Sequence, residues 1–310
     1  MALSARVFID GESGTTGLGI RERLRALPQI ELLSIDPERR RDQQARRGLM
    51  AEADIVVLCL PDDAARESAA LAASLGNRAP RLLDASSAHR VDPAWAYGFP
   101  ELEPGQPARI AGAARVANPG CYPTGAIALL RPLRDAGLLA EDAAISINAV
   151  SGYSGGGRSM IEAHEASGGP AFELYALDFG HKHLPETQAH ARLRRRPIFV
   201  PSVGHFRQGM LVSVPLHLDL LPGRPSLGAL HDVLAARYAG AALIRVMPTA
   251  SGERIEPEAL NDTDAMELRV YGSEPHRQAV LVARLDNLGK GASGAAVQNI
   301  LLMLEMSEHG

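Results

Sequence analysis

The sequence predicts an α/β protein in which a doubly wound parallel sheet is followed by a second α+β domain with a mixed, mostly antiparallel sheet. In the first third of the chain, short apolar segments alternate with helical patterns, as a parallel sheet with crossover helices requires. After residue 140, strand-like segments follow one another with few helical patterns between them, which favours antiparallel pairing.

Four apolar segments in the first third are predicted strands. One of them, "ADIVVLCL", is apolar throughout and is followed by Pro61, as expected for a parallel strand buried on both faces. The four strands are expected at residues 6–10, 30–36, 53–60 and 81–85. Two helices are expected between them, at residues 18–27 and 64–75. The first has an apolar face made of Leu18, Ile20, Leu24 and Leu27.

The second half is expected to form the other sheet, and the chain then ends in a helix. Strands are predicted at residues 143–151, 209–218, 242–248, 265–273 and 278–286. The final stretch, "GASGAAVQNILLMLEM", places Val297, Ile300, Leu301 and Leu304 on one helical face. We therefore expect a first domain of residues 1–119, completed by a C-terminal helix within 290–310, and a catalytic and dimerisation domain of residues 120–289.

The composition excludes several classes of protein. The 310 residues include 32 basic and 36 acidic side chains, a formal net charge of −4, which gives no support for a nucleic-acid partner. No apolar run approaches the roughly 20 residues of a membrane span. The start, "MALSARVFID", has no signal-peptide pattern, and two cysteines make no disulfide framework. We expect a cytoplasmic protein without nucleic-acid or membrane partners.

A glycine-rich loop lies between the first predicted strand and the first helix. In "GESGTTG" the glycines allow backbone N–H groups to approach a phosphate, and the helix N-terminus adds its dipole. The spacing is GxxGxxG rather than GxGxxG, so a flexible turn without a ligand is the alternative interpretation. The pattern predicts a Rossmann-type dinucleotide site. Its expected cofactor-binding residues are Gly11, Ser13, Gly14, Thr15, Thr16 and Gly17.

The choice between NAD and NADP stays open on these residues alone. Asp36 stands at the end of the second predicted strand, where an acidic side chain binds the ribose of NAD. Arg39, Arg40 and Arg41 follow closely and suit the additional phosphate of NADP.

The loop 117–125, "ANPGCYPTG", places a cysteine before a predicted helix. Pro123 suits the first helical position, so Cys121 is expected just before the helix N-terminus. Exposed backbone N–H groups and the positive end of the dipole stabilise a thiolate there. The alternative is a small buried residue in a tight turn. Cys59, inside an apolar strand, is interpreted as a packing residue.

Several segments, in this order along the chain, resemble the N-acetyl-γ-glutamyl-phosphate reductase family, in its shorter form, within the aspartate-semialdehyde-dehydrogenase-like superfamily. They are "GESGTTG", "LLDASSAHR", "YGFPEL", "ANPGCYPTG", "SGYSGGGR", "HKHLPE" and "DNLGKGASGAAVQN". The resemblance implies an oxidoreductase of arginine biosynthesis that uses NADP. Cys121 would attack N-acetyl-γ-glutamyl phosphate and form a thioester, and hydride transfer would yield N-acetylglutamate 5-semialdehyde.

The resemblance also implies roles for other residues. His181 is the favoured acid–base group, with Glu186 nearby and His205 as the alternative. Arg90 and Asn118 are expected to bind the substrate phosphate, with Arg115 as another candidate anchor. Ser154, Gly155 and Asn287 are expected to line the cofactor site.

No metal site is expected, because the pattern His-Lys-His has no third strong ligand nearby. A large mixed sheet in the second domain suits a symmetric interface, so we expect a homodimer or homotetramer.

Two rival interpretations remain at this stage. One is a sister enzyme: aspartate-semialdehyde dehydrogenase or another acyl-phosphate reductase. Phe199 stands where the aspartate enzymes have the arginine that binds the substrate's α-carboxylate, which counts against the aspartate enzyme. The other is a non-catalytic protein that senses a dinucleotide, which would need the glycine loop but no thiol at position 121.

Overall fold

The computed structural model describes residues 4–248 and 254–306, which form two compact units. The described residues of unit 1 are 4–100, 104–119 and 292–306, and those of unit 2 are 101–103, 120–248 and 254–291. Residues 307–310, the end of the range given for the C-terminal helix, lie outside the described residues.

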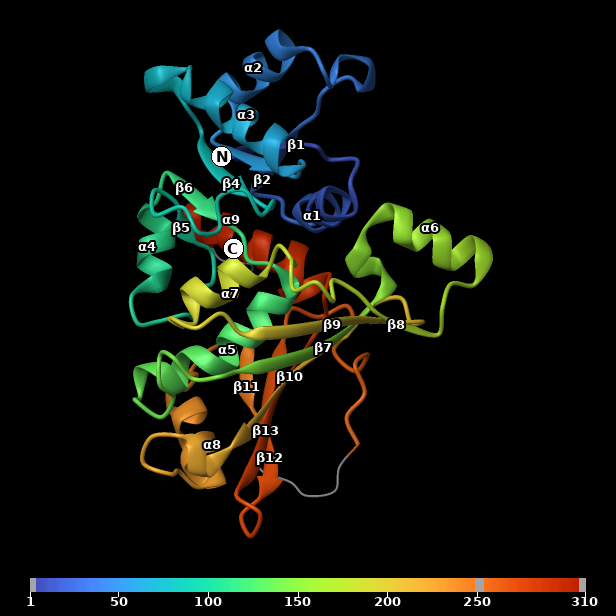
Figure 1. Cartoon of the computed structure of the whole chain (residues 1–310). Helices are drawn as coiled ribbons and strands as arrows, with labels where there is room; N and C mark the ends of the chain where they lie inside the picture. The colour runs from blue at the N-terminus through green and yellow to red at the C-terminus, as the bar shows by residue number, and fades with distance from the viewer. Residues whose placement is uncertain (1–3, 249–253, 307–310) are drawn as a thin grey trace. The chain divides into compact units, whose positions relative to one another are not determined.

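The described part of unit 1 contains a six-stranded sheet in the order β2-β1-β3-β4-β6-β5, and every neighbouring pair is parallel. This confirms the predicted doubly wound parallel sheet (Figure 1). The strands are β1 (Ala5–Asp10), β2 (Ile30–Leu33), β3 (Ile55–Leu58), β4 (Arg81–Asp84), β5 (Ala96–Tyr97) and β6 (Arg115–Ala117). The two short strands β5 and β6 were not among the predicted ones.

Helices pack against two separate apolar clusters of unit 1. Ile20 of α1 and Ile300 of α9 share one cluster with Val7 of β1, whereas Met50 of α2 and Leu71 of α3 join Phe8 in the other. The helices are α1 (Thr15–Arg25), α2 (Gln43–Glu52), α3 (Asp62–Ala73), α4 (Gln106–Gly112) and α9 (Gly294–Met303), with 3-10 turns η1 (Pro37–Arg39) and η2 (Gly76–Arg78).

The apolar face predicted for the first helix is partly wrong. Leu18 is 47 % exposed, whereas Ile20 and Leu24 are buried. The helix begins at Thr15, within the glycine loop. Helix α2 was not predicted, because Leu49 and Met50 are its only large apolar residues and adjacent positions give no helical periodicity.

Arg81 caps the ends of two helices in unit 1. Its guanidinium group donates to the carbonyl oxygens of Ile110, Ala111 and Ala113 at the end of α4, and to that of Met303 at the end of α9. The last carbonyl groups of a helix lack the usual intrahelical partners, and although the Ile110 oxygen also accepts from the N–H of Ala113, the arginine supplies further donors at both helix ends.

We expect Arg81→Met to lower the free energy of unfolding by about 2–3 kcal/mol, since charge-assisted hydrogen bonds to several backbone acceptors are lost together. Urea denaturation monitored by circular dichroism measures this change. The exposed Arg78 offers a matched control, and Arg78→Met should leave stability within about 0.5 kcal/mol of the wild type. Equal stability of the two variants would contradict the capping role.

Unit 2 contains a seven-stranded mixed sheet in the order β11-β12-β13-β10-β7-β9-β8 among its described residues. The pairs β11/β12 and β7/β9 are parallel and the other neighbouring pairs are antiparallel, which confirms the predicted mixed sheet. The strands are β7 (Ser146–Gly152), β8 (Phe172–Leu174), β9 (Ile198–Gly204), β10 (Met210–His217), β11 (Ile244–Val246), β12 (Met266–Ser273) and β13 (Gln278–Leu285).

The helices of unit 2 include α5, which is buried along most of its length and packs on strands β10 and β13. Helix α8 packs on β12 and on α5. The helices are α5 (Cys121–Asp135), α6 (Arg158–Ser167), α7 (Leu184–His190) and α8 (Leu227–Arg237), with 3-10 turns η3 (Tyr153–Gly156) and η4 (Leu218–Leu220). A π-helical turn, η5, covers Gly289–Ser293.

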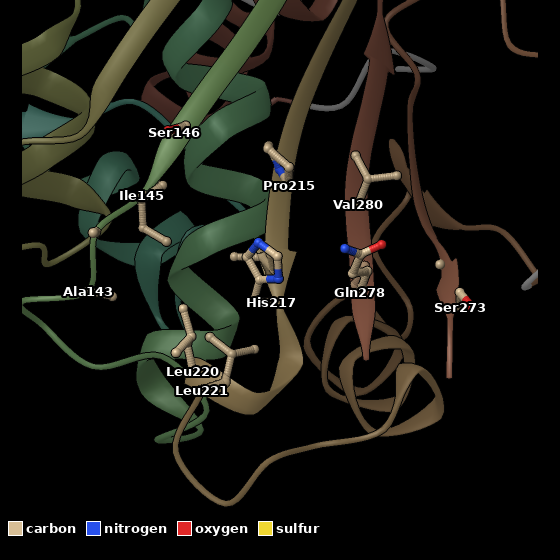
Figure 2. Close-up of a pocket in the computed structure, with 14 residues that line it drawn as sticks. Ala143, Ile145, Ser146, Pro215, His217, Leu220, Leu221, Ser273, Gln278 and Val280 are labelled. Atoms are coloured by element: carbon tan, nitrogen blue, oxygen red, sulfur yellow. The ribbon is translucent and has the colours of Figure 1, made fainter. Parts of the chain in front are cut away.

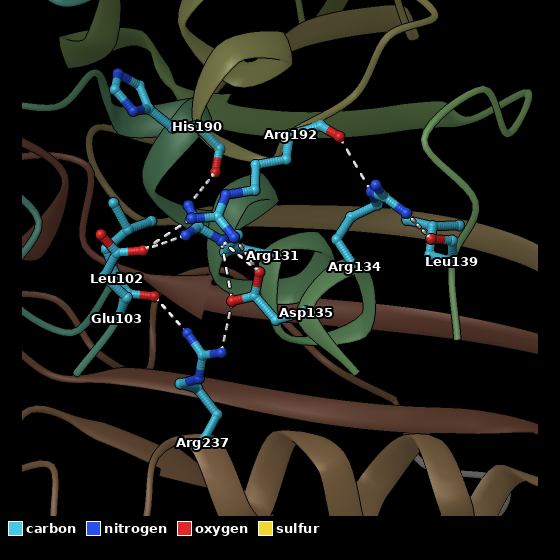
Figure 3. A network of polar contacts seen from close by, with 9 residues as sticks. All are labelled: Leu102, Glu103, Arg131, Arg134, Asp135, Leu139, His190, Arg192 and Arg237. Carbon is cyan, nitrogen blue, oxygen red and sulfur yellow. Dashed lines mark hydrogen bonds and ion pairs between the residues drawn. The ribbon is translucent and has the colours of Figure 1, made fainter. Parts of the chain in front are cut away.

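A network of charges holds the segment Glu101–Glu103 within unit 2. The buried Arg131 of α5 forms ion pairs with Glu103 and with Asp135, and Arg192 also contacts both carboxylates. Arg237 of α8 contacts Asp135 and donates to the carbonyl oxygen of Leu102 (Figure 3). The segment is therefore tied to α5 and α8 by side chains distant in sequence.

None of the helices in the described ranges is long and apolar enough to cross a membrane.

Candidate active site

Cys121 is the first residue of α5, so the helix begins two residues earlier than predicted. Gly120 precedes it in an extended conformation (φ −77°, ψ 153°), and Pro123 lies within the first turn. A proline is tolerated there because the first N–H groups of a helix have no intrahelical acceptor. The half-buried thiol therefore lies at the positive end of a 15-residue helix, where a thiolate is stabilised.

Glu186, in the first turn of α7, holds the backbone just before the cysteine. Its carboxylate is almost completely buried, and Oε1 accepts from the N–H of Gly120 at 2.8 Å. The glutamate thus fixes the entry into α5. The sequence placed Glu186 near the nucleophile but did not reveal this contact.

The turn Gly289–Ser293 approaches Cys121 closely. A Cβ on Gly291 would lie 3.0 Å from the Cβ of Cys121 and 3.5 Å from its Cα, so a side chain there would crowd the nucleophile. Next to it, Lys290 is only 1 % exposed, and its Nζ lies 2.8 and 2.9 Å from the two carboxylate oxygens of Glu101. Single π-helical turns such as Gly289–Ser293 often mark functional sites.

Lys290 was not among the predicted site residues. A lysine between two glycines in "LGKGAS" was the only local signal, and it does not show that the side chain is buried.

His181 lies in a ring cluster next to the start of α5. Its ring centroid is 5.9 Å from that of Tyr122, the residue after Cys121, and 5.1 Å from that of Phe199. Burial, with a smaller contribution from the charge of Lys182, lowers the pKa of His181 to about 4. The imidazole is therefore neutral at physiological pH.

His205 has different neighbours from His181. Its Nδ1 lies 3.0 Å from Nδ1 of His164, and the His164 ring stacks on Tyr153 at 4.6 Å. His205 itself is exposed. The structure thus brings His181 and Glu186 to the start of α5 with Cys121, and groups His205 with residues of η3 and α6.

Ser154, Gly155 and Asn287 lie together in unit 2. Nδ2 of Asn287 donates to Oγ of Ser154 at 2.9 Å, and its Oδ1 accepts from the N–H of Gly209 at 2.8 Å. A Cβ on Gly155 would come within 2.8 Å of Oγ of Ser151. These contacts fix the backbone after β7, where the sequence predicted part of a cofactor site.

In unit 1, the glycine loop connects β1 to α1. Gly11 has φ +92°, and a Cβ there would lie 2.4 Å from the carbonyl oxygen of Cys59, so only glycine fits. Gly17 packs tightly on the loop, since its Cβ would lie 2.8 Å from the carbonyl oxygen of Gly11. Gly14 is the N-cap residue of α1 and makes no side-chain hydrogen bond to the helix. The first turn of α1 has no acidic side chain.

The start of α1 is also accessible. Ser13 and Gly14 are exposed, and Thr15 and Thr16 are half-buried. The acid of this loop, Glu12, is paired with Arg21 at 2.9 Å, and the exposed helix start with its small residues fits a pyrophosphate group.

The side chains that would favour either NAD or NADP follow β2 in the sequence. This strand ends at Leu33, three residues earlier than predicted, and Asp36 caps η1 by accepting from the N–H of Glu38 at 2.9 Å. Arg39 is paired with Asp42, and this pairing lowers the pKa of the Asp42 carboxyl. Arg40 and Arg41 are exposed. The carboxylate that would favour NAD is thus engaged in a turn.

Arg90 and Asn118 contact each other in unit 1. Nε of Arg90 donates to the backbone oxygen of Asn118 at 2.9 Å, and both side chains are buried. The amide of Asn118 donates to the carbonyl oxygen of Ala292 and accepts from Asn299. The predicted pair therefore lies together, but the Asn118 amide is bonded at both ends within unit 1. Arg115, the other candidate anchor, is exposed and lies 6.0 Å from the Trp95 ring.

The two thiols differ in environment, and this leads to a labelling prediction. Burial, together with the charges of Asp84 and Asp10, raises the pKa of Cys59 to about 12. At pH 7.5 Cys59 is therefore almost entirely in its unreactive thiol form. We expect iodoacetamide to modify Cys121 in the native protein while Cys59 stays unmodified, as measured by peptide mass spectrometry. Labelling of Cys59 at a comparable rate would contradict this prediction.

A cavity of about 630 Å³ lies elsewhere in unit 2, at the end of the sheet where β10 finishes and β13 begins. Figure 2 shows His217, Gln278 and Val280 among its lining residues. None of the predicted site residues lines this cavity, so it plays no part in the candidate active site.

In the parts of the chain that the structure describes, no group of three or more metal-binding side chains is found.

Comparisons with known proteins identify the family of this chain. Residues 6–110 match the family model "Semialdehyde dehydrogenase, NAD binding domain", and residues 121–287 match "Semialdehyde dehydrogenase, dimerisation domain". Curated N-acetyl-gamma-glutamyl-phosphate reductases of Brucella canis, Brucella abortus and Brucella melitensis are 54 % identical to this chain over 310 residues, with 97 % of this chain and 99 % of each relative covered.

Solved structures show the same fold at low identity. Aspartate semialdehyde dehydrogenase II from Vibrio cholerae, complexed with ASA, is 18 % identical with a TM-score of 0.70, covering 97 % of this chain and 98 % of that one. The Candida albicans enzyme with NADP is 15 % identical with a TM-score of 0.66, and the match covers 97 % and 98 % of the two chains. By its sequence relatives, the chain belongs to the N-acetyl-γ-glutamyl-phosphate reductase family of semialdehyde dehydrogenases.

Proposed function

We propose that this protein reduces N-acetyl-γ-glutamyl phosphate to N-acetylglutamate 5-semialdehyde with NADPH, a step of arginine biosynthesis. The observation that carries this proposal is the position of Cys121 at the start of α5, in a chain 54 % identical to relatives of that name. In this family the reaction requires a thiol. The N-terminus of a helix makes a thiol nucleophilic because it stabilises the thiolate.

Cys121 is the nucleophile in this proposal. Its thiolate attacks the acyl carbon, the C–O bond to phosphate breaks, and a thioester forms as phosphate leaves. NADPH, when bound, supplies the hydride that reduces the thioester carbon. Hydride transfer leaves a negatively charged thiohemiacetal oxygen, which takes up a proton and then loses it again. Collapse of the thiohemiacetal breaks the C–S bond, releases the aldehyde and regenerates the thiolate.

His181 and Glu186 support these steps. Because His181 is neutral, it acts first as an N–H donor to the oxygen that becomes negative in each tetrahedral intermediate. Glu186 keeps the loop before Cys121 in place through Gly120. In unit 1, the guanidinium group of Arg90 supplies positive charge for the substrate phosphate.

We propose NADP rather than NAD as the cofactor. One carboxylate oxygen of the exposed Asp36 caps η1, and the exposed Arg40 and Arg41 follow β2 in the sequence, where a 2′-phosphate would be bound. The Candida albicans relative is described with NADP, which supports the same choice. Gly11, Gly14 and Gly17 would let the backbone approach the pyrophosphate, with Ser13, Thr15 and Thr16 as further donors; Ser154, Gly155 and Asn287 would shape the nicotinamide end.

The test is the reverse reaction, followed as NADPH absorbance with N-acetylglutamate semialdehyde, phosphate and NADP. We expect phosphate-dependent turnover with this aldehyde and at least 100-fold lower kcat/KM with aspartate semialdehyde. Phe199 supports this preference, because it packs against Tyr122 and His181 and offers no cation for a carboxylate. Preferential turnover of aspartate semialdehyde would overturn the proposal.

We also propose that the protein is a homodimer or homotetramer that associates through the sheet of unit 2. Helices α5 and α8 pack on one face of this sheet. On the other face, Val150, Leu211 and Val280 are only half-buried. A matched domain described as a dimerisation domain is consistent with this surface as the interface.

Ser213 lies near the centre of that face, paired with Asn148 on one side and Val282 on the other. We expect Ser213→Arg to reduce the solution mass toward the 33.0 kDa of one chain, because a buried unpaired cation opposes association. Light scattering coupled to size exclusion measures this, with Leu18→Arg on unit 1 as the control. An unchanged oligomer would exclude this face as the interface.

A further inference from the structure

A chain of hydrogen bonds starts at His181 and ends inside unit 2. Nε2 of His181 lies 3.4 Å from the hydroxyl oxygen of Tyr175, and the Tyr175 hydroxyl donates to that of Tyr122 at 3.2 Å. The Tyr122 hydroxyl then donates to the backbone oxygen of Ser202 at 3.0 Å. On the other side of the imidazole, Nδ1 accepts from the N–H of His183 at 3.1 Å.

The direction of every hydrogen bond in this chain is determined by its two ends. The Ser202 carbonyl can only accept, so Tyr122 donates to it and its oxygen is left to accept from Tyr175. The proton of Tyr175 is thereby used, and its oxygen can only accept from Nε2–H of His181. The backbone N–H of His183 can only donate, so Nδ1 must carry a lone pair. Both ends therefore require the same tautomer, with the proton on Nε2.

The ring of His181 and the hydroxyl groups of Tyr175 and Tyr122 are all neutral at physiological pH. The lowered pKa of His181 keeps the ring neutral, as a chain with one donor and one acceptor nitrogen needs. Burial raises the pKa of Tyr175 to about 12 and that of Tyr122 well above its usual value, so both stay protonated. The charge of Cys121 contributes to both shifts, which places the two hydroxyl groups within electrostatic reach of the nucleophile.

We propose that Tyr175 is a positioning residue for His181: its hydroxyl oxygen, oriented through Tyr122, holds the imidazole as the Nε2–H tautomer and in one orientation next to the start of α5. The inference rests on the proposed role of His181 and adds to it the residue that makes this histidine a donor. Because the chain ends at a backbone carbonyl, it orients the ring and carries no proton to solvent. The long 3.4 Å contact is the one that a substrate oxygen would replace.

The test compares Tyr175→Phe with Tyr238→Phe. Tyr238 is a matched control because its buried hydroxyl also donates within unit 2, to the backbone oxygen of Ala128 at 2.8 Å. We expect Tyr175→Phe to lower kcat about tenfold with KM changed less than about twofold. Tyr238→Phe should leave both constants within about twofold of the wild type.

Nitrogen-15 NMR of labelled histidine provides a readout that does not depend on turnover. In the wild type, we expect His181, assigned with a His181→Gln variant, to show a protonated Nε2 and an unprotonated Nδ1 that do not titrate down to about pH 5. In Tyr175→Phe the Nε2 signal should shift and broaden because its acceptor is lost, whereas Tyr238→Phe should leave it unchanged.

Three results would overturn the proposal. They are an Nδ1–H tautomer or a charged ring at pH 7 in the wild type, an unchanged Nε2 signal in Tyr175→Phe, and a kcat in that variant within twofold of the wild type. Failure of the proposed function is distinguishable from all of them. In that case the wild type would not turn over N-acetylglutamate semialdehyde, and the nitrogen signals alone would decide the role of Tyr175.

Discussion

Cys121→Ser is expected to lower kcat by roughly 10⁴-fold or more, while the dissociation constant for NADP changes less than about twofold. The helix N-terminus at Cys121 favours a negative charge, but it favours it by far too little to ionise a hydroxyl group at neutral pH. Serine would therefore bind substrate beside the same backbone and fail to form the ester. Turnover is measured in the reverse direction and cofactor binding by calorimetry.

Cys59→Ala is the control for this variant, because Cys59 packs against the core of unit 1 and its raised pKa keeps it a thiol. Its kcat should stay within about twofold of the wild type. Persisting turnover in Cys121→Ser would show that another group is the nucleophile. A wild type that binds NADP and turns over none of the aldehydes would instead favour the non-catalytic alternative.

Most of the sheet strands were visible in the sequence, and the missed ones have physical reasons. Strands such as β3 and β12 are apolar or alternating runs bounded by turn residues, so their patterns are local. Strand β9 contains Pro201 and ends at Gly204, both of which weaken a strand pattern, yet it pairs with β7 over seven residues. Strand β8 has only three residues, too few for a pattern to show.

The candidate site was predictable where its signal is local. A few adjacent residues are enough to predict a backbone conformation or a reactive group in the glycine loop, in the cysteine loop and in "HKHLPE". The supporting contacts are not local: Glu186 meets Gly120 across 66 positions, and Lys290 meets Glu101 across 189. Such pairs depend on how distant segments fold together, so no spacing rule in one sequence reveals them.

Lys290→Met is expected to lower the free energy of unfolding by about 3–5 kcal/mol, because it removes an almost completely buried cation that lies 2.8 Å from the carboxylate of Glu101. Lys290 is the charged residue of the turn Gly289–Ser293, and its side chain is almost completely buried. Gly291 of the same turn lies against Cys121. We therefore expect kcat to fall about 10–100-fold even at temperatures where the variant is folded, since small displacements near a nucleophile are costly. Unfolding in urea and steady-state kinetics give the two quantities.

The double variant Lys290→Met with Glu101→Gln separates the two effects. Removing both charges of the pair should restore a large part of the stability, because both members are replaced together, but not the anchor that holds the turn against Cys121. Glu103→Gln is the matched control in the same segment, since Glu103 is paired with Arg131 and Arg192 of the network in Figure 3 and has no contact with that turn among those described. It should lose stability with kcat within about twofold of the wild type. If the double variant regains full activity along with its stability, the ion pair contributes only to folding, and the position of the turn against Cys121 does not depend on it.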